Sequence, residues 1–294
     1  MDKGYFGVEQ RIDRLARRVL DRLPRSRLWD GLVEFVVFGL KQGWACLFGG
    51  LMLALLLGTA LFWPDGAALA RYDFLVIAAL AIQIGMIALR LETLAEARVI
   101  VIFHVVGTVM ELFKTGAGSW TYPEPSLLRI GDVPLFSGFM YACVGSYMAR
   151  IQRIFDIRFE RYPPVWITAL LALAIYVNFF SHHFVPDMRI PLFVVLALVY
   201  ARTMMHYRVH RFWHRMPILL AFGLVTFFIW VAENLGTWSR AWLYPSQLEG
   251  WRMVGIEKFG SWYLLMTISV VLVTLVHRPV TMDRSLIGTQ APAP

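Results

Sequence analysis

Two glutamates have the residue type and the position to do chemistry. Glu111 and Glu233 each stand at the end of an otherwise apolar segment. A carboxyl group within a membrane is costly, so it usually faces the protein interior and often marks a functional site. Burial and a neighbouring carboxyl both favour the protonated form. Such a pair could protonate an apolar substrate or bind and release a transported proton. Capping of local structure, or pairing with Lys114 or Arg240, is the structural alternative.

The same residue types follow both glutamates at the same distances. An offset of 122 residues relates Glu111 to Glu233 without gaps. It also matches Thr115 with Thr237, Trp120 with Trp242, Tyr122 with Tyr244, Pro123 with Pro245, Gly138 with Gly260 and Tyr141 with Tyr263. Glu, Trp, Tyr and Pro in one window are a demanding set, and self-similarity at one spacing predicts an internal duplication.

The matched aromatic residues predict the walls of a cavity. The segments 114–133 and 236–259, rich in Gly, Trp, Tyr and Pro, are interpreted as re-entrant loops around its mouth. The predicted substrate-binding aromatic residues are Trp120, Tyr122, Tyr141, Trp242, Tyr244 and Tyr263. Aromatic walls suit a long apolar or polyene ligand and stabilise a cation electrostatically. The preference of Trp and Tyr for membrane interfaces is the structural alternative.

His104 precedes Glu111 by seven residues, which is about two helical turns, so both side chains project from nearly the same helix face. A His and a carboxylate on one face could form a proton relay or half of a metal site, and we include His104 among the catalytic candidates. The matching residue in the second half is Thr226, so this feature is not symmetric. Helix packing is the alternative role.

Lys114 and Asn178 complete the predicted substrate-binding set. Lys114 follows Glu111 by three residues, and Asn178 precedes the pair His182 and His183 at the end of another apolar segment. These residues could join the same cavity, although an interfacial location would also explain the two histidines.

Three further histidines recur every fourth residue. His206, His210 and His214 would share one face of a helix, a spacing that suits metal ligands. Arginines are interleaved with them, and no carboxylate completes a ligand set in this stretch. The favoured interpretation is therefore a basic helix end, and the sequence predicts no metal site.

Composition determines the class of protein. The chain has 294 residues, of which 58% are hydrophobic and 16% are charged, and its formal net charge is +8. Soluble domains carry about a quarter charged residues, so this composition favours a polytopic membrane protein and disfavours a soluble enzyme or a nucleic-acid partner. No glycine-rich phosphate motif, serine-hydrolase elbow or haem attachment motif is present. No cofactor is evident, and membrane lipids or a lipophilic ligand are the expected partners.

Eight apolar segments approach the length needed to cross a bilayer. They are roughly Trp44–Trp63, Phe74–Leu89, Val99–Phe113, Pro134–Met148, Val165–Ser181, Ile190–Ala201, Pro217–Glu233 and Ser261–Val276. Basic residues concentrate in alternate connecting segments, as the positive-inside rule requires of an inner membrane protein with both termini in the cytoplasm.

The expected fold is all-α. Residues 1–43 form a cytoplasmic or interfacial segment with an amphipathic helix over Phe6–Leu23, where five arginines flank apolar residues at helical spacing. Two parallel four-helix repeats follow at 44–150 and 151–277, and 278–294 is a cytoplasmic tail. An even number of spans gives both halves the same orientation, so both glutamates are expected on the outer side.

The stretch "MELFKTGAGSWTYPEPSLLRIGDVPLFSGFMYACVGSYMAR" resembles a bacterial integral-membrane family, domain of unknown function 817. That resemblance runs from about Trp29 to Val276 and supports a membrane location. More remotely, Glu-Leu, a Gly-rich turn, a Tyr and then Val-Pro-Leu are similar to the membrane carotenoid hydratases, although Trp120 departs from their pattern. Those enzymes and the small membrane lycopene cyclases protonate polyene ends without a redox cofactor. The resemblance implies that Glu111 and Glu233 are the acid and base.

The sequence therefore leaves three functional interpretations. The preferred one is a cofactor-independent enzyme that hydrates, cyclises or isomerises an isoprenoid or carotenoid-like lipid. A proton-coupled small-molecule transporter would use the same duplicated acids. A structural subunit that stabilises a membrane partner is the third.

Overall fold

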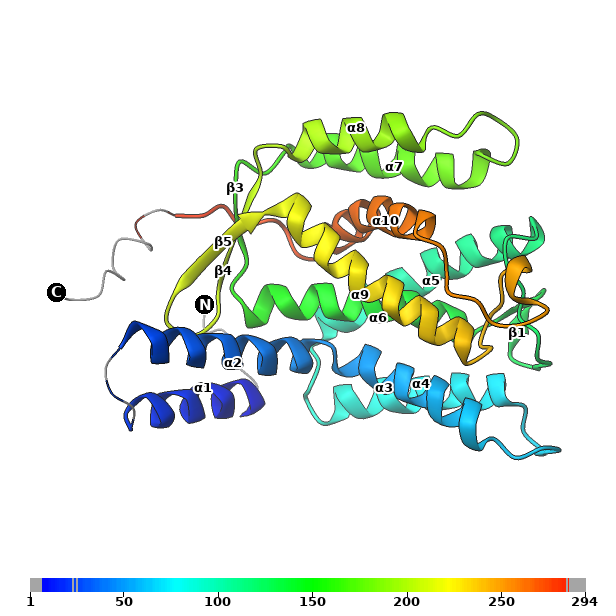
Figure 1. Ribbon diagram of the computed structural model, residues 1–294, viewed down its shortest axis with the longest axis horizontal. Helices are drawn as coiled ribbons and strands as arrows, with labels where there is room; N and C mark the ends of the chain where they lie inside the picture. Colours follow the sequence, from blue (N-terminus) through cyan, green and yellow to red (C-terminus); the bar gives the residue numbers. More distant parts are fainter. Residues whose placement is uncertain (1–6, 23, 25, 284, 286–294) are drawn as a thin grey trace.

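The computed structural model describes residues 7–22, 24, 26–283 and 285, and it is mostly helical (Figure 1). The helices are α1 (Gly7–Leu20), α2 (Arg27–Ala45), α3 (Leu47–Phe62), α4 (Arg71–Ala88), α5 (Leu94–Gly116), α6 (Phe136–Ile154), α7 (Val165–Ser181), α8 (Arg189–Tyr200), α9 (Ile218–Trp238) and α10 (Glu257–Thr274), with a 3₁₀ turn at Pro245–Gln247. The short strands are β1 (Arg129–Ile130), β2 (Val133–Pro134), β3 (Arg158–Glu160), β4 (Met204–Arg208) and β5 (Trp213–Pro217).

Each of the eight predicted apolar segments corresponds to one helix from α3 to α10. Three of these, α4, α5 and α9, are long and apolar enough to cross a membrane by length and composition. A fourth candidate is the pair α2 and α3, which bends by 65° at Cys46. The described residues thus fit a helical membrane protein with three or four candidate spans.

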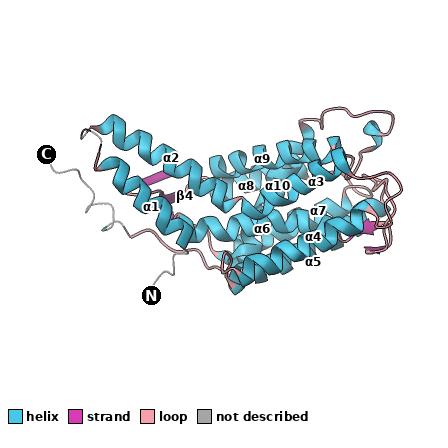
Figure 2. Ribbon diagram, turned by 90° about the horizontal axis from the view of Figure 1, so that it is seen from below, coloured by secondary structure: helices cyan, strands magenta, loops and turns pink. Residues whose placement is uncertain are grey.

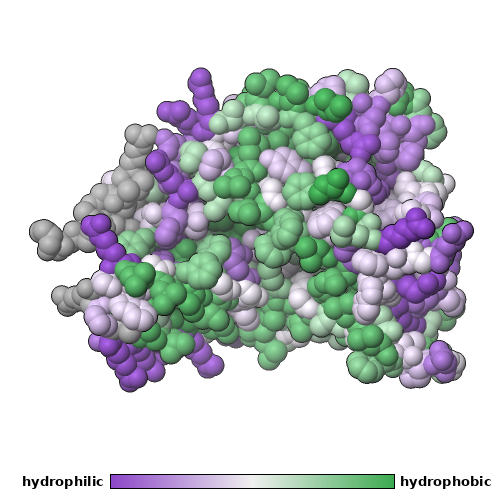
Figure 3. Space-filling model, viewed as in Figure 1, coloured by the Kyte–Doolittle hydropathy of each residue, from purple (hydrophilic) through white to green (hydrophobic). Residues whose placement is uncertain are grey.

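The surface agrees with this class. Figure 3 shows a broad hydrophobic band between two hydrophilic ends. We name the end with α1 and strands β3 to β5 the ribbon end, and the opposite end with β1, β2 and their neighbouring loops the bridge end (Figure 1). Many large apolar side chains of the band are exposed, as lipid contact requires; examples are Phe62, Ile84, Leu198 and Phe228.

The predicted amphipathic segment is helix α1, which lies along α2 (Figure 2). Its Glu9 is fully buried, accepts a hydrogen bond from Trp44 Nε1 at 3.2 Å and forms an ion pair with Arg153 of α6. Arg153 also donates to Glu96 of α5 at 2.9 Å. These contacts join the N-terminal helix to the bundle at the ribbon end.

The helical interpretation of the three spaced histidines is wrong. His206 and His214 belong to the antiparallel hairpin β4–β5, and His210 lies in its turn. A different carboxylate approaches each of them: Glu160 at 3.4 Å from His206, Asp13 at 3.2 Å from His210 and Glu34 at 3.6 Å from His214. Three separate pairs hold the hairpin against β3, α1 and α2, so the histidines do not converge on one site.

Helices α5 and α6 pack closely through glycines. A Cβ atom at Gly107 would lie 2.5 Å from the Tyr141 ring, and one at Gly145 would lie 2.7 Å from the Phe103 ring. Atoms cannot approach so closely, so only glycine permits this packing. The contact fixes the position of Tyr141 relative to α5.

Two isolated bridges join segments that are distant in the sequence. Thr121 pairs antiparallel with Leu243 at the bridge end, and Phe159 pairs parallel with Thr281 beside the ribbon-end strands. In both bridges the partners are 122 residues apart, the same offset that relates the two glutamates.

Candidate functional site

Glu111 is buried near the end of α5 with three hydrogen-bond donors around its carboxyl group. Trp120 Nε1 and the Tyr122 hydroxyl donate to Oε2 at 2.7 and 2.6 Å. The Tyr141 hydroxyl of α6 donates to Oε1 at 2.7 Å. The carboxyl is 4% exposed, so these neutral donors replace water as its solvation.

Glu233 lies in the same type of site at the end of α9. Trp242 Nε1 and the Tyr244 hydroxyl both donate to its Oε1, at 2.9 and 2.7 Å. In both halves the tryptophan follows the glutamate by nine residues and the tyrosine by eleven. Both glutamates are therefore satisfied by aromatic donors, and neither forms an ion pair with Lys114 or Arg240 in the described structure.

Helices α5 and α9 end in the same way, and this shared ending brings the Trp and Tyr side chains to each glutamate. Gly118 and Arg240 have positive φ angles of 71° and 56°, and each follows the last turn of its helix. The next amide then donates back to the helix: Ser119 N to the Lys114 carbonyl at 2.9 Å and Ala241 N to the Gly236 carbonyl at 3.1 Å. This Schellman-type reversal turns the chain back towards the glutamate. Residues two apart on extended backbone share one side, so Trp and Tyr both reach the carboxyl.

The bridge between Thr121 and Leu243 joins the two sites. Each residue donates its amide hydrogen to the other's carbonyl at 2.9 Å. Trp120 of the first site lies edge-on to Tyr244 of the second, with ring centroids 6.0 Å apart. The structure therefore forms one continuous polar centre from two similar parts.

The tyrosines of the loops remain hydrogen-bond donors in this centre. Burial, and after it the adjacent carboxylate, hold the pKa of Tyr122 and of Tyr244 well above that of an ordinary phenol. The hydroxyl protons therefore stay on both residues at neutral pH.

The two sites differ in their third partner. Tyr263, which matches Tyr141, donates to the Leu219 carbonyl at 2.8 Å and not to Glu233. Lys258, which stands where the first half has Phe136, lies over the Tyr244 ring at 4.3 Å. Lys258 also attracts Glu233 electrostatically. The Glu111 site therefore has a third neutral donor, and the Glu233 site has a nearby cation.

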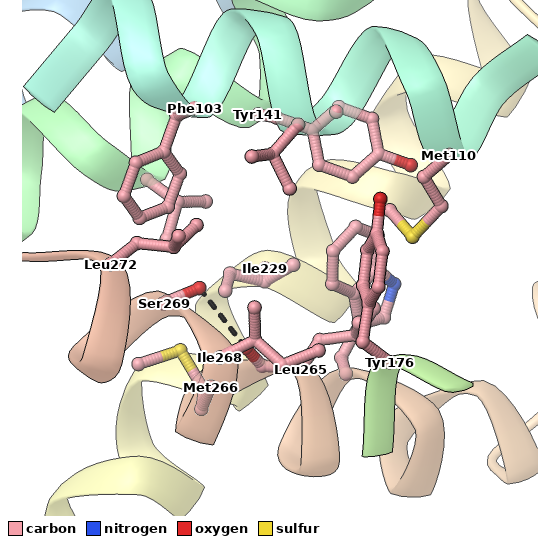
Figure 4. A pocket seen from close by; sticks show the side chains of 14 residues that line it. Phe103, Met110, Tyr141, Tyr176, Ile229, Leu265, Met266, Ile268, Ser269 and Leu272 are labelled. Atoms are coloured by element: carbon pink, nitrogen blue, oxygen red, sulfur yellow. Dashed lines mark hydrogen bonds between the residues drawn. The ribbon is translucent and has the colours of Figure 1, made fainter. Parts of the chain in front are cut away.

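An apolar pocket lies beside the Glu111 site, between helices α5, α6, α7, α9 and α10 (Figure 4). Its polar lining is limited to Tyr141, Tyr176, Trp262 and Ser269. The free volume is about 40 Å³, which is room for a few water-sized groups. The remaining lining residues are Phe103, Val106, Gly107, Met110, Val144, Ile229, Leu265, Met266, Ile268 and Leu272. Tyr141 belongs to both the pocket and the carboxyl site.

The other candidates from the sequence lie at varying distances from this centre. His104 lies against the Phe139 ring at a tilt of 52°, with ring centroids 4.5 Å apart, and packs where Gly138 leaves space. Asn178 fixes the loop after α7, since its side chain accepts from Met188 N at 2.9 Å and donates to Asp187 at 3.3 Å. Lys114 is 3% exposed and contacts His183 at 3.2 Å.

Sequence reasoning did not identify the apolar pocket or Lys258. Residues such as Met110 and Leu265 do not differ in type from side chains that face lipid, so no sequence signal marked them. Lys258 did carry a signal, because the 122-residue offset replaces the aromatic Phe136 with a cation there. Within the described residues, no group of three or more His, Cys, Asp or Glu side chains could hold a metal ion.

Comparison with known proteins gives the relationship of the chain. The family described as "Protein of unknown function (DUF817)" matches residues 34–270, which is most of the sequence. The chain belongs to this family. It is similar to the "Uncharacterized protein YoaT" of Bacillus subtilis (strain 168), with 41% identity over 240 residues, covering 82% of this chain and 90% of the relative. No solved structure matches the chain.

Proposed function

We propose that helices α3 to α10 form eight membrane spans arranged as two parallel four-helix repeats. Both isolated bridges join residues at the repeat offset, which supports a two-fold axis along the membrane normal. A two-fold axis along the membrane normal reverses the direction of any segment that lies in the membrane plane. Two equivalent segments of this kind therefore pair antiparallel, as at Thr121 and Leu243. Strands that follow the axis are parallel, as at Phe159 and Thr281.

The distribution of basic residues supports an orientation. The ribbon end carries the arginines of α1 and of the hairpin β4–β5, so we assign it and both termini to the cytoplasmic side of an inner membrane. The Glu111 and Glu233 centre then lies near the outer surface.

Within this architecture, we propose a membrane enzyme that performs acid–base chemistry on an isoprenoid-like lipid. Hydration, cyclisation and double-bond isomerisation of such a lipid all begin with protonation of an alkene. One observation carries the proposal: Tyr141 lines the apolar pocket, and its hydroxyl donates to buried Glu111 at 2.7 Å. An acid beside an apolar pocket matches an apolar substrate that must exchange a proton.

The contacts suggest how the proton moves. When Glu111 is protonated, the hydrogen bond reverses: the carboxyl donates to the Tyr141 oxygen, Tyr141 gives its own hydroxyl proton to the alkene carbon of the substrate, and the carboxyl proton replaces it. Trp120 and Tyr122 then stabilise the carboxylate, since both already donate to its oxygen. The reverse transfer removes a proton from the substrate cation. The aromatic rings of Tyr176 and Trp262 in the pocket wall stabilise that cation.

The size of the pocket defines what it accepts. About 40 Å³ is room for a few water-sized groups, so the pocket would admit the tip of a chain, such as a terminal methyl group, and the remainder of a long lipid would lie along the apolar surface of the helices. A largely apolar lining also disfavours this pocket as an ion pathway, because transported ions need polar groups to replace their hydration.

A proton-coupled transporter is the second candidate. The observation that favours it is the presence of two similar buried carboxyls, Glu111 and Glu233, on either side of one bridge. Transport requires exchange of protons with both aqueous sides, whereas the proposed enzyme requires exchange with its substrate and with water on one side.

Deuterium incorporation tests the enzymatic proposal. Purified full-length protein in nanodiscs is incubated in D₂O with a panel of polyenes and isoprenoid alcohols, and products are analysed by mass spectrometry. We expect deuterium incorporation by the wild type and a loss of about 100-fold or more for Glu111→Gln and Tyr141→Phe. The matched variant Tyr263→Phe removes a hydroxyl that contacts a carbonyl, and it should retain activity within about twofold.

The outcomes separate the two candidates. Equal incorporation by wild type and Glu111→Gln would contradict the assigned acid. Proton uptake into proteoliposomes that depends on Glu111 and Glu233, without deuterium incorporation into any substrate, would replace the enzyme with the transporter.

A further inference from the structure

The face of α5 that lines the pocket continues into a buried lysine at the bridge end. Phe103, Val106, Gly107 and Met110 line the pocket at helical spacing, and Lys114 follows Met110 by one turn. The side chain of Lys114 is nearly completely buried. A cation thus lies directly beyond the outer end of the apolar pocket.

Helices α7 and α10 also each have a basic residue beyond the pocket, towards the bridge end. Tyr176 of α7 lines the pocket, and His183 follows it by two turns, beyond the helix end. Trp262 of α10 lines the pocket, and Lys258 precedes it by one turn. Helix α10 runs in the opposite direction along the pocket, since its first turn is at the bridge end, so all three basic residues extend the pocket towards that end.

Contacts among these residues are direct. Lys114 Nζ lies 3.2 Å from His183 Nε2 and 3.5 Å from His182 Nε2, and it lies over the Phe179 ring at 4.3 Å. Lys258 and Arg189 are close enough to repel Lys114 electrostatically. Arg189 is paired with Asp187 at ion-pair distance.

Neither lysine has an acidic partner at ion-pair distance among the residues that the structure describes. Lys114 contacts two imidazole nitrogens, and its third N–H donor is available to a ligand. Lys258 lies over aromatic rings, at 4.3 Å from Tyr244 and 6.0 Å from Trp120. A buried cation (Lys114) beside a half-buried one (Lys258), neither paired with a carboxylate in the described structure, is costly, and a bound anion would lower that cost.

We infer that the outer end of the pocket binds the phosphate group of an amphipathic lipid, whose apolar chain end occupies the pocket between α5, α7 and α10. This inference rests on the proposed function and names the substrate class: an isoprenyl phosphate. A phosphate presents several acceptor oxygens and a negative charge, which match two ammonium groups and the nearby imidazoles. An uncharged isoprenoid alcohol or hydrocarbon would leave both lysines without a counter-ion.

Direct binding measurements test the inference without requiring turnover. Full-length protein in nanodiscs of phosphatidylcholine, which carry no net negative charge, is titrated with farnesyl phosphate, farnesol or inorganic phosphate. We expect farnesyl phosphate to bind at least about tenfold more tightly than farnesol or inorganic phosphate, since charged hydrogen bonds contribute this order of affinity.

Matched variants identify the residues. Lys114→Met and Lys258→Met keep most of the side-chain length and remove the charge, and each should abolish the preference for farnesyl phosphate while leaving farnesol affinity within about twofold. Arg129→Gln is the control, because Arg129 is a partly exposed cation at the same end that pairs with Asp132. Thermal unfolding shows whether each lysine variant is folded. If one variant fails to fold, the other still tests the inference.

Two results would overturn the inference. Unchanged affinity for farnesyl phosphate in both folded lysine variants would exclude the lysines as its ligands. Inorganic phosphate that binds as tightly as farnesyl phosphate would show a free-anion site and exclude a lipid. Glu111→Gln separates this inference from the enzymatic proposal: it should bind farnesyl phosphate as the wild type does, even if neither protein incorporates deuterium.

Discussion

Helices α5 and α6 of the first half pack much more closely than α9 and α10 can in the second. Gly107 admits the Tyr141 ring and Gly145 admits the Phe103 ring in the first half. The residues at the repeat offset are Ile229 and Thr267, whose side chains fill the space that the glycines leave open. Ile229 instead lines the pocket. The pocket thus lies where the second half lacks the glycine contacts of the first.

This difference explains how similar sites acquire different partners. Both halves keep a glutamate with Trp and Tyr donors, which requires only a short loop after one helix. The third donor depends on how closely the next helix packs. Tyr141 reaches Glu111 because α6 lies against α5, whereas Tyr263 donates to the Leu219 carbonyl and packs beside Phe222. Helix spacing, and not the loop motif, determines which glutamate is hydrogen-bonded to a residue of the pocket wall.

The largest effect is expected from introducing the second-half residue into the first half. Gly107→Ile would bring Cβ to 2.5 Å from the Tyr141 ring, and α6 would have to move away. Overpacking of this kind costs about 3 kcal/mol. We expect a clear decrease in the thermal unfolding temperature in detergent and loss of the hydrogen bond to Glu111.

Gly85→Ala in α4 is the control, because a Cβ there meets no other atom within 4 Å. Equal stability of Gly107→Ile and Gly85→Ala would contradict the proposed difference in helix spacing.

Much of this comparison could be predicted from the sequence. The Glu-Trp-Tyr spacing identified both sites, because a local loop motif repeats in sequence as it does in space. The different partners of Tyr141 and Tyr263 could not be predicted, since both are tyrosines at matching positions and only the neighbouring helices distinguish them. The eight helices were predictable from apolar length, whereas the bend at Cys46 left no pattern.

The histidine hairpin shows a second limit. Residues four apart share a face in a helix, but a turn separates His206 of β4 from His214 of β5. His214 pairs with Tyr207 and His206 pairs with Arg215, so these two histidines lie on opposite faces of the hairpin. The spacing of the three histidines did not reveal this turn. The carboxylates that approach them come from β3, α1 and α2, so tertiary contacts decide the outcome.

The paired tryptophans provide a sharper test of the difference between sites. Trp120→Phe leaves Glu111 with two donors, Tyr122 and Tyr141. Trp242→Phe leaves Glu233 with Tyr244 as its remaining donor in the described structure. A lost hydrogen bond to a buried carboxyl costs about 1–3 kcal/mol, and we expect the higher cost for Trp242→Phe. Thermal unfolding of both variants measures the difference; a larger decrease for Trp120→Phe would show that Lys258 compensates in the second half.

The hairpin β4–β5 is the remaining difference, because the first half has only the short turn between α4 and α5 at this position. Asp13 of α1 contacts the hairpin at His210 and also forms an ion pair with Lys41 at 2.9 Å. Burial raises the pKa of Asp13, but hydrogen bonds from His210 and Lys41 outweigh it and hold the pKa below the ordinary value of 3.8.

The smallest effect is therefore a loss of stability in acid. Because the folded state lowers the pKa of Asp13, its contribution is fully present above pH 3.8 and disappears as the pH falls through the lower folded value. Asp13→Asn should lower stability by about 1 kcal/mol at pH 5, since it removes a charged hydrogen bond. The difference between wild type and variant should then shrink between pH 5 and pH 3, as thermal unfolding in detergent would measure. If the difference in stability stays constant over this range, the charge of Asp13 does not contribute to the contact between α1 and the hairpin β4–β5. The packing of the Asp13 side chain would then account for its effect.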